Sequence, residues 1–175
     1  MQSNVARKLQ GGQNRSAGKA FEDMIARSFE FHRKEGIAII DKTPEPMKII
    51  RRMQGGHFEA CFEKRAQPDF KGVLKGGQAI VCEVKCTTTA KLHKDVVNKW
   101  QAAYLNEAAS LGAWCYVIAG FISHGIWNAY KIPWEIWSGM EEYYGHKYIT
   151  EAEAEKYRVE RNGFRFCLLK GGARK

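Results

Sequence analysis

Apolar residues recur at helical spacing in two long segments of the chain. Phe21, Ile25 and Phe29 follow this spacing and predict a helix over residues 15–34. A second helical pattern covers residues 94–111 and ends at Gly112, a residue typical of helix ends. Shorter helices are predicted over residues 133–143 and 150–160.

The remaining apolar runs are short and rich in β-branched and aromatic residues, which is typical of strands. Lys75-Gly76-Gly77 separates two of these runs and predicts a hairpin turn. The order of helices and strands indicates an α/β domain built on a mixed sheet. The predicted strands are residues 37–40, 69–74, 78–85, 113–121, 126–132 and 164–169.

Two segments do not fit the pattern of a packed core. Residues 1–14 are polar, contain Gly11-Gly12 and predict a flexible basic arm. The Pro-rich break at residues 43–46 opens an insertion at about 44–67, which is basic and contains the Gly55-Gly56 turn. We interpret this insertion as a protruding hairpin, or stalk, within a single domain of residues 15–175.

The overall composition is that of a soluble protein, with 45 % apolar and 27 % charged residues. No run approaches the roughly 18 apolar residues of a membrane span, and the N-terminal residues lack the apolar core of a signal peptide. We therefore expect a cytoplasmic protein. The net charge of +9 favours a polyanionic partner, nucleic acid before an anionic membrane surface, although solubility alone also explains a basic chain.

The five cysteines are an odd number and predict reduced thiols, mostly buried in strands, rather than a disulfide framework. Cys82 and Cys86, with His57 and His93 nearby in sequence, leave a zinc site conceivable. No CxxC pair supports that alternative.

Two charged residues stand inside the most apolar of the predicted strands. Glu83 and Lys85 are two positions apart, so they point to the same face of the strand 78–85. Burying them has a desolvation cost that packing does not explain. The Gly76-Gly77 hairpin places Asp69, at the start of the preceding strand, beside them. Two carboxylates then converge where a hard cation such as Mg²⁺ finds oxygen ligands.

This arrangement predicts metal-dependent phosphodiester cleavage. The metal would activate water and neutralise charge on the phosphate, while Lys85 would stabilise the hydroxide form of that water. An acid-x-Lys triplet alone is a weak signal, since Asp69-Phe70-Lys71 is a second one. The alternative interpretation is a structural Glu83–Lys85 ion pair on a half-exposed edge strand.

Two polar residues lie on otherwise apolar helical stripes. Glu22 shares its stripe with Ile25 and Phe29, and Gln101 lies among the apolar positions of helix 94–111. Glu22 is a candidate additional metal ligand, directly or through water. Gln101 is a candidate for holding a water or the scissile phosphate. For both, a boundary position at the rim of the core is the alternative.

Several blocks of the sequence, in order, resemble the RecU-type Holliday junction resolvases, which are nucleases of the PD-(D/E)xK superfamily. Asn14-Arg15 followed by residues 18–23 resembles the N-terminal helix of that family. Asp69 to Val73, followed by Glu83-Val84-Lys85, resembles its catalytic hairpin, and Gln101 stands where the family also has Gln. The basic insertion is similar to its stalk, which enters the junction opening.

The resemblance implies a restriction-endonuclease-like core and a homodimer that nicks a four-way DNA junction symmetrically with Mg²⁺ or Mn²⁺. Asp69, Glu83 and Lys85 would form the nuclease triad, assisted by Glu22 and Gln101. Metal ligands would be Asp69, Glu83 and Glu22. The expected DNA contacts are Arg15, Arg51, Arg52, Lys64, Arg65, Lys71 and Lys91.

The chain departs from the family at the first acid, with Pro-Asp-Phe-Lys-Gly at residues 68–72 where the family usually carries Thr-Asp-Tyr-Asn-Gly. It is also short, which suits a phage-encoded member. These departures leave two other functions open: a related nuclease acting on ends, flaps or linear duplex, or a non-catalytic DNA-binding accessory protein.

Overall fold

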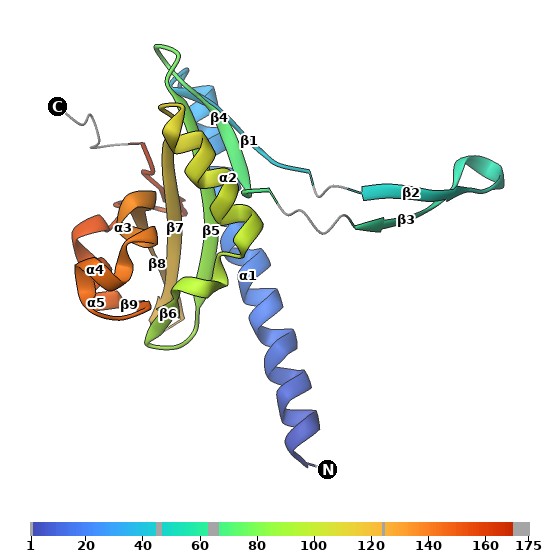
Figure 1. Ribbon diagram of the computed structural model, residues 1–175, viewed down its shortest axis with the longest axis horizontal. Helices are drawn as coiled ribbons and strands as arrows, with labels where there is room; N and C mark the ends of the chain where they lie inside the picture. Colours follow the sequence, from blue (N-terminus) through green and yellow to red (C-terminus); the bar gives the residue numbers. More distant parts are fainter. Residues whose placement is uncertain (1, 45–46, 63–66, 124, 170–175) are drawn as a thin grey trace.

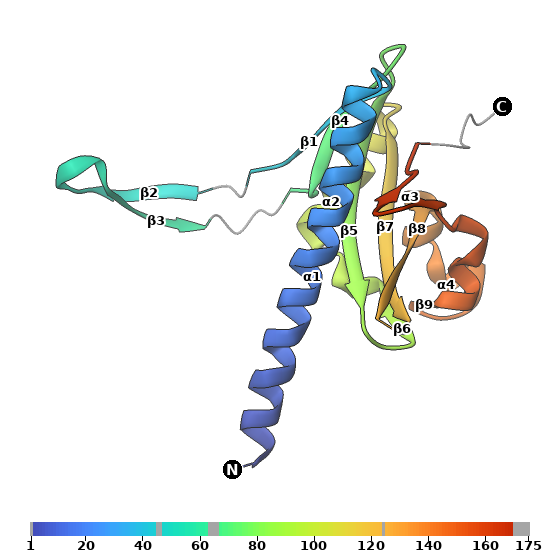
Figure 2. The same ribbon diagram turned by 180° about the vertical axis from the view of Figure 1, so that it is seen from behind.

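The first element is a 33-residue helix, α1 (Gln2–Lys34), that runs along one face of the central sheet and extends beyond it (Figures 1 and 2). The computed structural model describes residues 2–44, 47–62, 67–123 and 125–169, without the side chains of residues 2–15, 62 and 123. The predicted flexible arm over residues 1–14 is therefore wrong for residues 2–14, which are helical. Good helix formers such as Arg7, Lys8 and Leu9 outweigh the cost of Gly11-Gly12.

The central sheet has five strands in the order β1-β4-β5-β7-β8. β5 and β7 run parallel, and the other neighbouring pairs are antiparallel. The mixed sheet predicted from the sequence is thus confirmed. The bounds of its strands are β1 (Ala38–Lys42), β4 (Phe70–Leu74), β5 (Ala79–Thr87), β7 (Trp114–Ser123) and β8 (Ile126–Pro133).

Helices cover both faces of the sheet, so β5 is buried on both sides (Figures 1 and 2). On one face, α1 packs Phe21, Ile25 and Phe29 against the sheet, all at most 1 % exposed. Gly120 of β7 makes this approach possible, since a Cβ there would lie 2.6 Å from the Phe21 ring. On the other face, α2 (Lys99–Ser110) packs Leu105 onto a second core cluster.

Smaller elements complete the domain on the α2 side of the sheet. Two short helices, α3 (Trp134–Ser138) and α4 (Met140–Tyr144), follow β8 in place of the single helix predicted over residues 133–143. β6 (Lys91–His93) pairs with β9 (Tyr148–Thr150), and α5 (Glu151–Ala154) follows β9. The 3₁₀ helices are η1 (Gln54–Gly56), η2 (Lys94–Val96) and η3 (Glu155–Tyr157).

The predicted last strand is shorter than expected. β11 (Arg165–Phe166) pairs only with β10 (Arg161–Asn162) in a small hairpin outside the central sheet. The N–H of Phe166 donates to Ser28 Oγ of α1 at 3.0 Å, so a helix side chain takes the place of a neighbouring strand.

The predicted stalk is present as a hairpin that projects from the domain (Figures 1 and 2). β2 (Met47–Arg52) pairs with β3 (Phe58–Phe62), and every residue of β2 is exposed. The residues that flank the stalk are hydrogen-bonded to each other: the N–H of Thr43, after β1, donates to the carbonyl of Asp69, before β4, at 2.7 Å. The hairpin therefore leaves the domain next to Asp69.

The five cysteines are all free, as expected, but their burial varies. Cys82 and Cys115 are buried in central strands, whereas Cys61 is exposed on β3 of the stalk. Across the described ranges, no helix combines the length and apolar character that crossing a membrane requires.

Candidate active site

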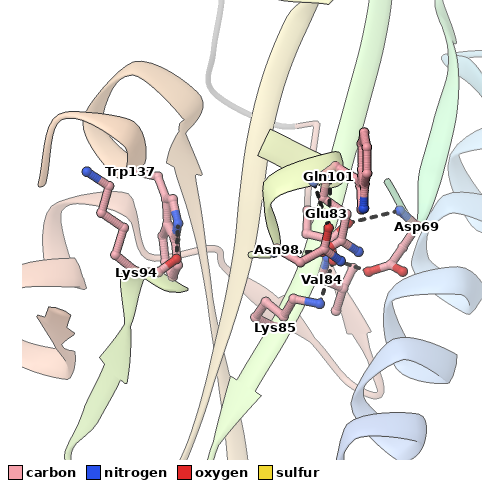
Figure 3. A network of polar contacts seen from close by, with 9 residues as sticks. Asp69, Glu83, Val84, Lys85, Lys94, Asn98, Gln101 and Trp137 are labelled. Carbon is pink, nitrogen blue, oxygen red and sulfur yellow. Dashed lines mark hydrogen bonds and ion pairs between the residues drawn. The ribbon is translucent and has the colours of Figure 1, made fainter. Parts of the chain in front are cut away.

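The predicted triad comes together where β4 and β5 lie side by side (Figure 3). Asp69 directly precedes β4. Phe70 pairs with Cys82, and continuing this register by one residue places Asp69 opposite Glu83. The N–H of Asp69 donates to Glu83 Oε2 at 3.3 Å. Asp69 Oδ2 in turn accepts a 2.8 Å hydrogen bond from the N–H of Val84. These two contacts fix both carboxylates on adjacent strands.

Lys85 is held against Glu83 by an ion pair. Its Nζ lies 2.6 Å from Glu83 Oε1, and both side chains project from the same face of β5. Glu83 is completely buried, whereas Lys85 is 24 % exposed. The alternative of an ion pair on an edge strand is wrong in its placement, because β5 is the central strand of the sheet.

Burial shifts the protonation of both carboxyl groups. Desolvation raises the pKa of Glu83 to about 8, the nearby Lys85 ammonium opposes this rise, and the charge of Asp69 adds to it. Desolvation also raises the pKa of Asp69, against the hydrogen bond from the Val84 N–H. Burial and the charge of Asp69 therefore make ionisation of Glu83 less favourable, a condition that a bound cation relieves.

The donor set fits a hard divalent cation. Two carboxylates on neighbouring strands supply oxygen ligands, which Mg²⁺ and Mn²⁺ prefer. Glu83 Oε1 is buried and makes no hydrogen bond of regular geometry within the described residues, although the Lys85 ammonium is beside it. In the described ranges, no three His, Cys, Asp or Glu side chains already gather tightly enough to hold a metal ion, zinc included.

Glu22, the predicted third acid, approaches the site from α1 without joining the two carboxylates. Its charge adds to the rise in the pKa of Asp69 that desolvation causes. Glu22 Oε1 is bound by Lys42 Nζ at 2.8 Å, and this hydrogen bond raises the pKa of Lys42. Sequence reasoning missed Lys42, because no periodic pattern links it to Glu22 twenty residues earlier.

Gln101 lies beside Glu83 at the start of α2 (Figure 3). It is 5 % exposed, and its Oε1 accepts from the main-chain N–H of Asn98 at 3.2 Å and from Asn98 Nδ2 at 2.9 Å. Asn98 and Gln101 thus form a capping box that fixes the first turn of α2. The spacing Asn-x-x-Gln is a signal for this cap that the sequence reasoning did not use.

The predicted DNA contacts are distributed over three regions. Arg51 and Arg52 are exposed on the stalk. Lys71 lies on β4 near the site, where its Nζ donates to Gln67 Oε1 at 2.5 Å and lies 5.2 Å from the Tyr104 ring centroid. Lys91 belongs to β6. Lys64 and Arg65 lie outside the described residues, as does the side chain of Arg15.

Comparison with known proteins identifies a family. The family model described as "Recombination protein U" matches residues 16–168. The chain is 29 % identical over 123 residues to the Holliday junction resolvase RecU of Streptococcus gordonii, covering 66 % of this chain and 60 % of that protein. It is 28 % identical over 151 residues to the RecU of Geobacillus kaustophilus, covering 80 % of this chain and 73 % of that protein.

A solved structure also resembles this chain. It is that of Hjc, a Holliday junction resolvase from Archaeoglobus fulgidus. The two chains are 18 % identical, the match covers 73 % of this chain and 86 % of that one, and the TM-score is 0.39.

Proposed function

Since the chain belongs to the Recombination protein U family, we propose that it is a metal-dependent endonuclease that resolves four-way DNA junctions by symmetric nicking. The observation that carries this proposal is the convergence of Asp69, Glu83 and Lys85 on one buried point of a central strand. The names of the relatives supply the substrate class. The reaction would serve DNA recombination and repair in the cytoplasm.

Asp69 and Glu83 would hold Mg²⁺, for which Mn²⁺ can substitute, and Glu22 would assist, directly or through water. The bound ion supplies Lewis-acid polarisation of the phosphate and activation of water. Lys85 would place its ammonium group beside the attacking water and offset the negative charge that develops on the phosphate. Gln101, held by Asn98, would orient that water or the scissile phosphate from the opposite side.

The stalk would supply binding to the branched DNA. The stalk leaves the domain next to Asp69 and carries Arg51 and Arg52 away from it along the hairpin, so these two arginines would bind phosphates at a distance from the cleavage site. One protomer contains one such site, whereas paired nicks need two. A homodimer that follows the two-fold symmetry of a junction satisfies this requirement.

The test is a panel of substrates with the purified protein. A mobile four-way junction, a linear duplex and a flap are incubated with Mg²⁺ or with EDTA, and the products are separated on denaturing gels. Paired symmetric nicks in the junction alone, only with Mg²⁺, are expected. Preferential cutting of the duplex or flap would assign the protein to another class of nuclease, and metal-independent binding without cutting would make it an accessory protein.

A further inference from the structure

A two-stranded sheet, β6–β9, lies beyond the carboxyl end of β5 and has one polar face (Figure 1). Leu92 pairs with Ile149 in this sheet, and both are at most 2 % exposed. Because side chains alternate along a strand, Lys91 and His93 of β6 and Tyr148 of β9 share the opposite face. Lys91 and His93 are exposed there.

The Tyr148 ring holds two of its neighbours in place. Lys91 Nζ lies 4.0 Å from the ring centroid, in a cation–π contact. The His146 ring stacks on Tyr148 at 3.8 Å with an angle of 6° between the planes, and His93 lies 5.8 Å away. Lys91 is therefore pre-organised, so binding an anion would cost it less side-chain entropy than a free lysine.

The positive charge of this face is not neutralised by carboxylates. Within the described ranges, neither Lys91 nor His93 forms an ion pair with an acid. Glu153 of α5 accepts hydrogen bonds from Thr150 and lies 3.0 Å from His146 Nε2.

A short, hydrogen-bonded loop joins this face to the catalytic strand. Thr89 donates its N–H to Thr87 Oγ1 at 3.0 Å and its hydroxyl to the Lys91 carbonyl at 3.0 Å. At about 3.3 Å per residue, Thr87 lies roughly 13 Å beyond Glu83 along β5. Thr89 contacts both Thr87 and Lys91, so the face lies at the Thr87 end of β5, several base-pair steps of B-DNA from Glu83.

We propose that Lys91, His93 and Tyr148 form a contact surface for the phosphate backbone of the DNA arm that leaves the active site, several base pairs from the cleaved bond. Lys91 and His93 contact the phosphates, and Tyr148 positions the lysine. This inference rests on the proposed function, because it takes the substrate to be duplex arms joined at a branch. This surface would be a second DNA-binding region of the protein, separate from the stalk.

The test is hydroxyl-radical footprinting of a four-way junction bound in EDTA, so that binding is measured without cleavage. Wild type is expected to protect a segment of backbone several base pairs from the cleavage position, and Lys91→Gln is expected to lose that protection alone. Affinity at about 0.1 M salt should fall about five- to tenfold, and the slope of log affinity against log salt should decrease by about one. Lys75→Gln, in the exposed turn at the other end of β5, is the matched control.

Tyr148 provides the second variant. Tyr148→Phe keeps the ring and should bind as wild type, whereas Tyr148→Leu should behave as Lys91→Gln. An unchanged footprint and salt slope in Lys91→Gln would overturn the inference, whether or not Tyr148→Leu folds. The two proposals can fail independently. Equal binding of junction and linear duplex by wild type would contradict the junction function. If Lys91→Gln then weakened binding to both DNAs, the contact surface would still be supported.

Discussion

Replacing Glu83 by Gln is expected to stabilise the metal-free protein and to end its cleavage of DNA. Glu83 is completely buried, and its pKa is raised to about 8 by desolvation. Gln has nearly the same shape and no charge to bury, so the variant avoids the unfavourable ionisation. A residue kept for stability would show the opposite effect.

The magnitude follows from the difference between the folded and unfolded states. The ordinary pKa of this carboxyl is 4.5, so at pH 7 it is ionised in the unfolded chain and mostly protonated in the folded one. The folded state then binds more protons, and stability falls as the pH rises from 4.5 to about 8. At about 1.4 kcal/mol per pH unit, the loss reaches at most about 3 kcal/mol at pH 7.

Urea denaturation in EDTA at pH 5, 6, 7 and 8 measures this effect. Wild type should lose stability relative to Glu83→Gln across the series, and Mg²⁺ should restore stability to wild type only. Glu142→Gln, at an exposed position of α4, is the control and should run parallel to wild type. Parallel curves for wild type and Glu83→Gln, or a less stable variant at pH 7, would refute the reasoning.

Three further results are expected. Asp69→Asn should abolish cleavage and leave junction binding in EDTA within about twofold of wild type, because the substitution removes the charge of a metal ligand but no contact with a phosphate. Near-normal cleavage on gels would show that Asp69 is not a ligand. The affinity for Mg²⁺, followed by calorimetry, should rise with pH up to about 8, since Glu83 must lose its proton to bind; a flat profile would argue against Glu83 as a ligand. Replacing Arg51 and Arg52 together by alanine should weaken binding and lower the salt slope by about two; an unchanged slope would remove the stalk from the interface.

The catalytic hairpin could be predicted because its chemistry conflicts with its surroundings. The apolar run around Glu83 and Lys85 indicates a buried strand, and the two charged residues within it indicate a functional site, because burying them is otherwise unfavourable. The Gly76-Gly77 turn determines which strand pairs with it. The stalk was predictable for a similar reason, since a basic segment bounded by prolines has no place in a core.

Other parts of the site depend on contacts that no local pattern encodes. The pairing of Glu22 with Lys42 joins a helix to a strand and appears only once both are packed. Gln101 was identified as unusual, but its bond to Asn98 gives it a capping role besides any catalytic one. The helical state of residues 2–14 is hard to predict, because Gly11-Gly12 lies among good helix formers and opposes them.

The most direct test of the metal site is anomalous diffraction from crystals of the protein soaked in Mn²⁺. The account predicts one strong peak within coordinating distance of both the Asp69 and Glu83 carboxylates, and no such peak in Asp69→Asn. If wild-type crystals showed no peak beside these carboxylates, or a peak only elsewhere in the molecule, the claim that these two acids form the catalytic centre would be contradicted.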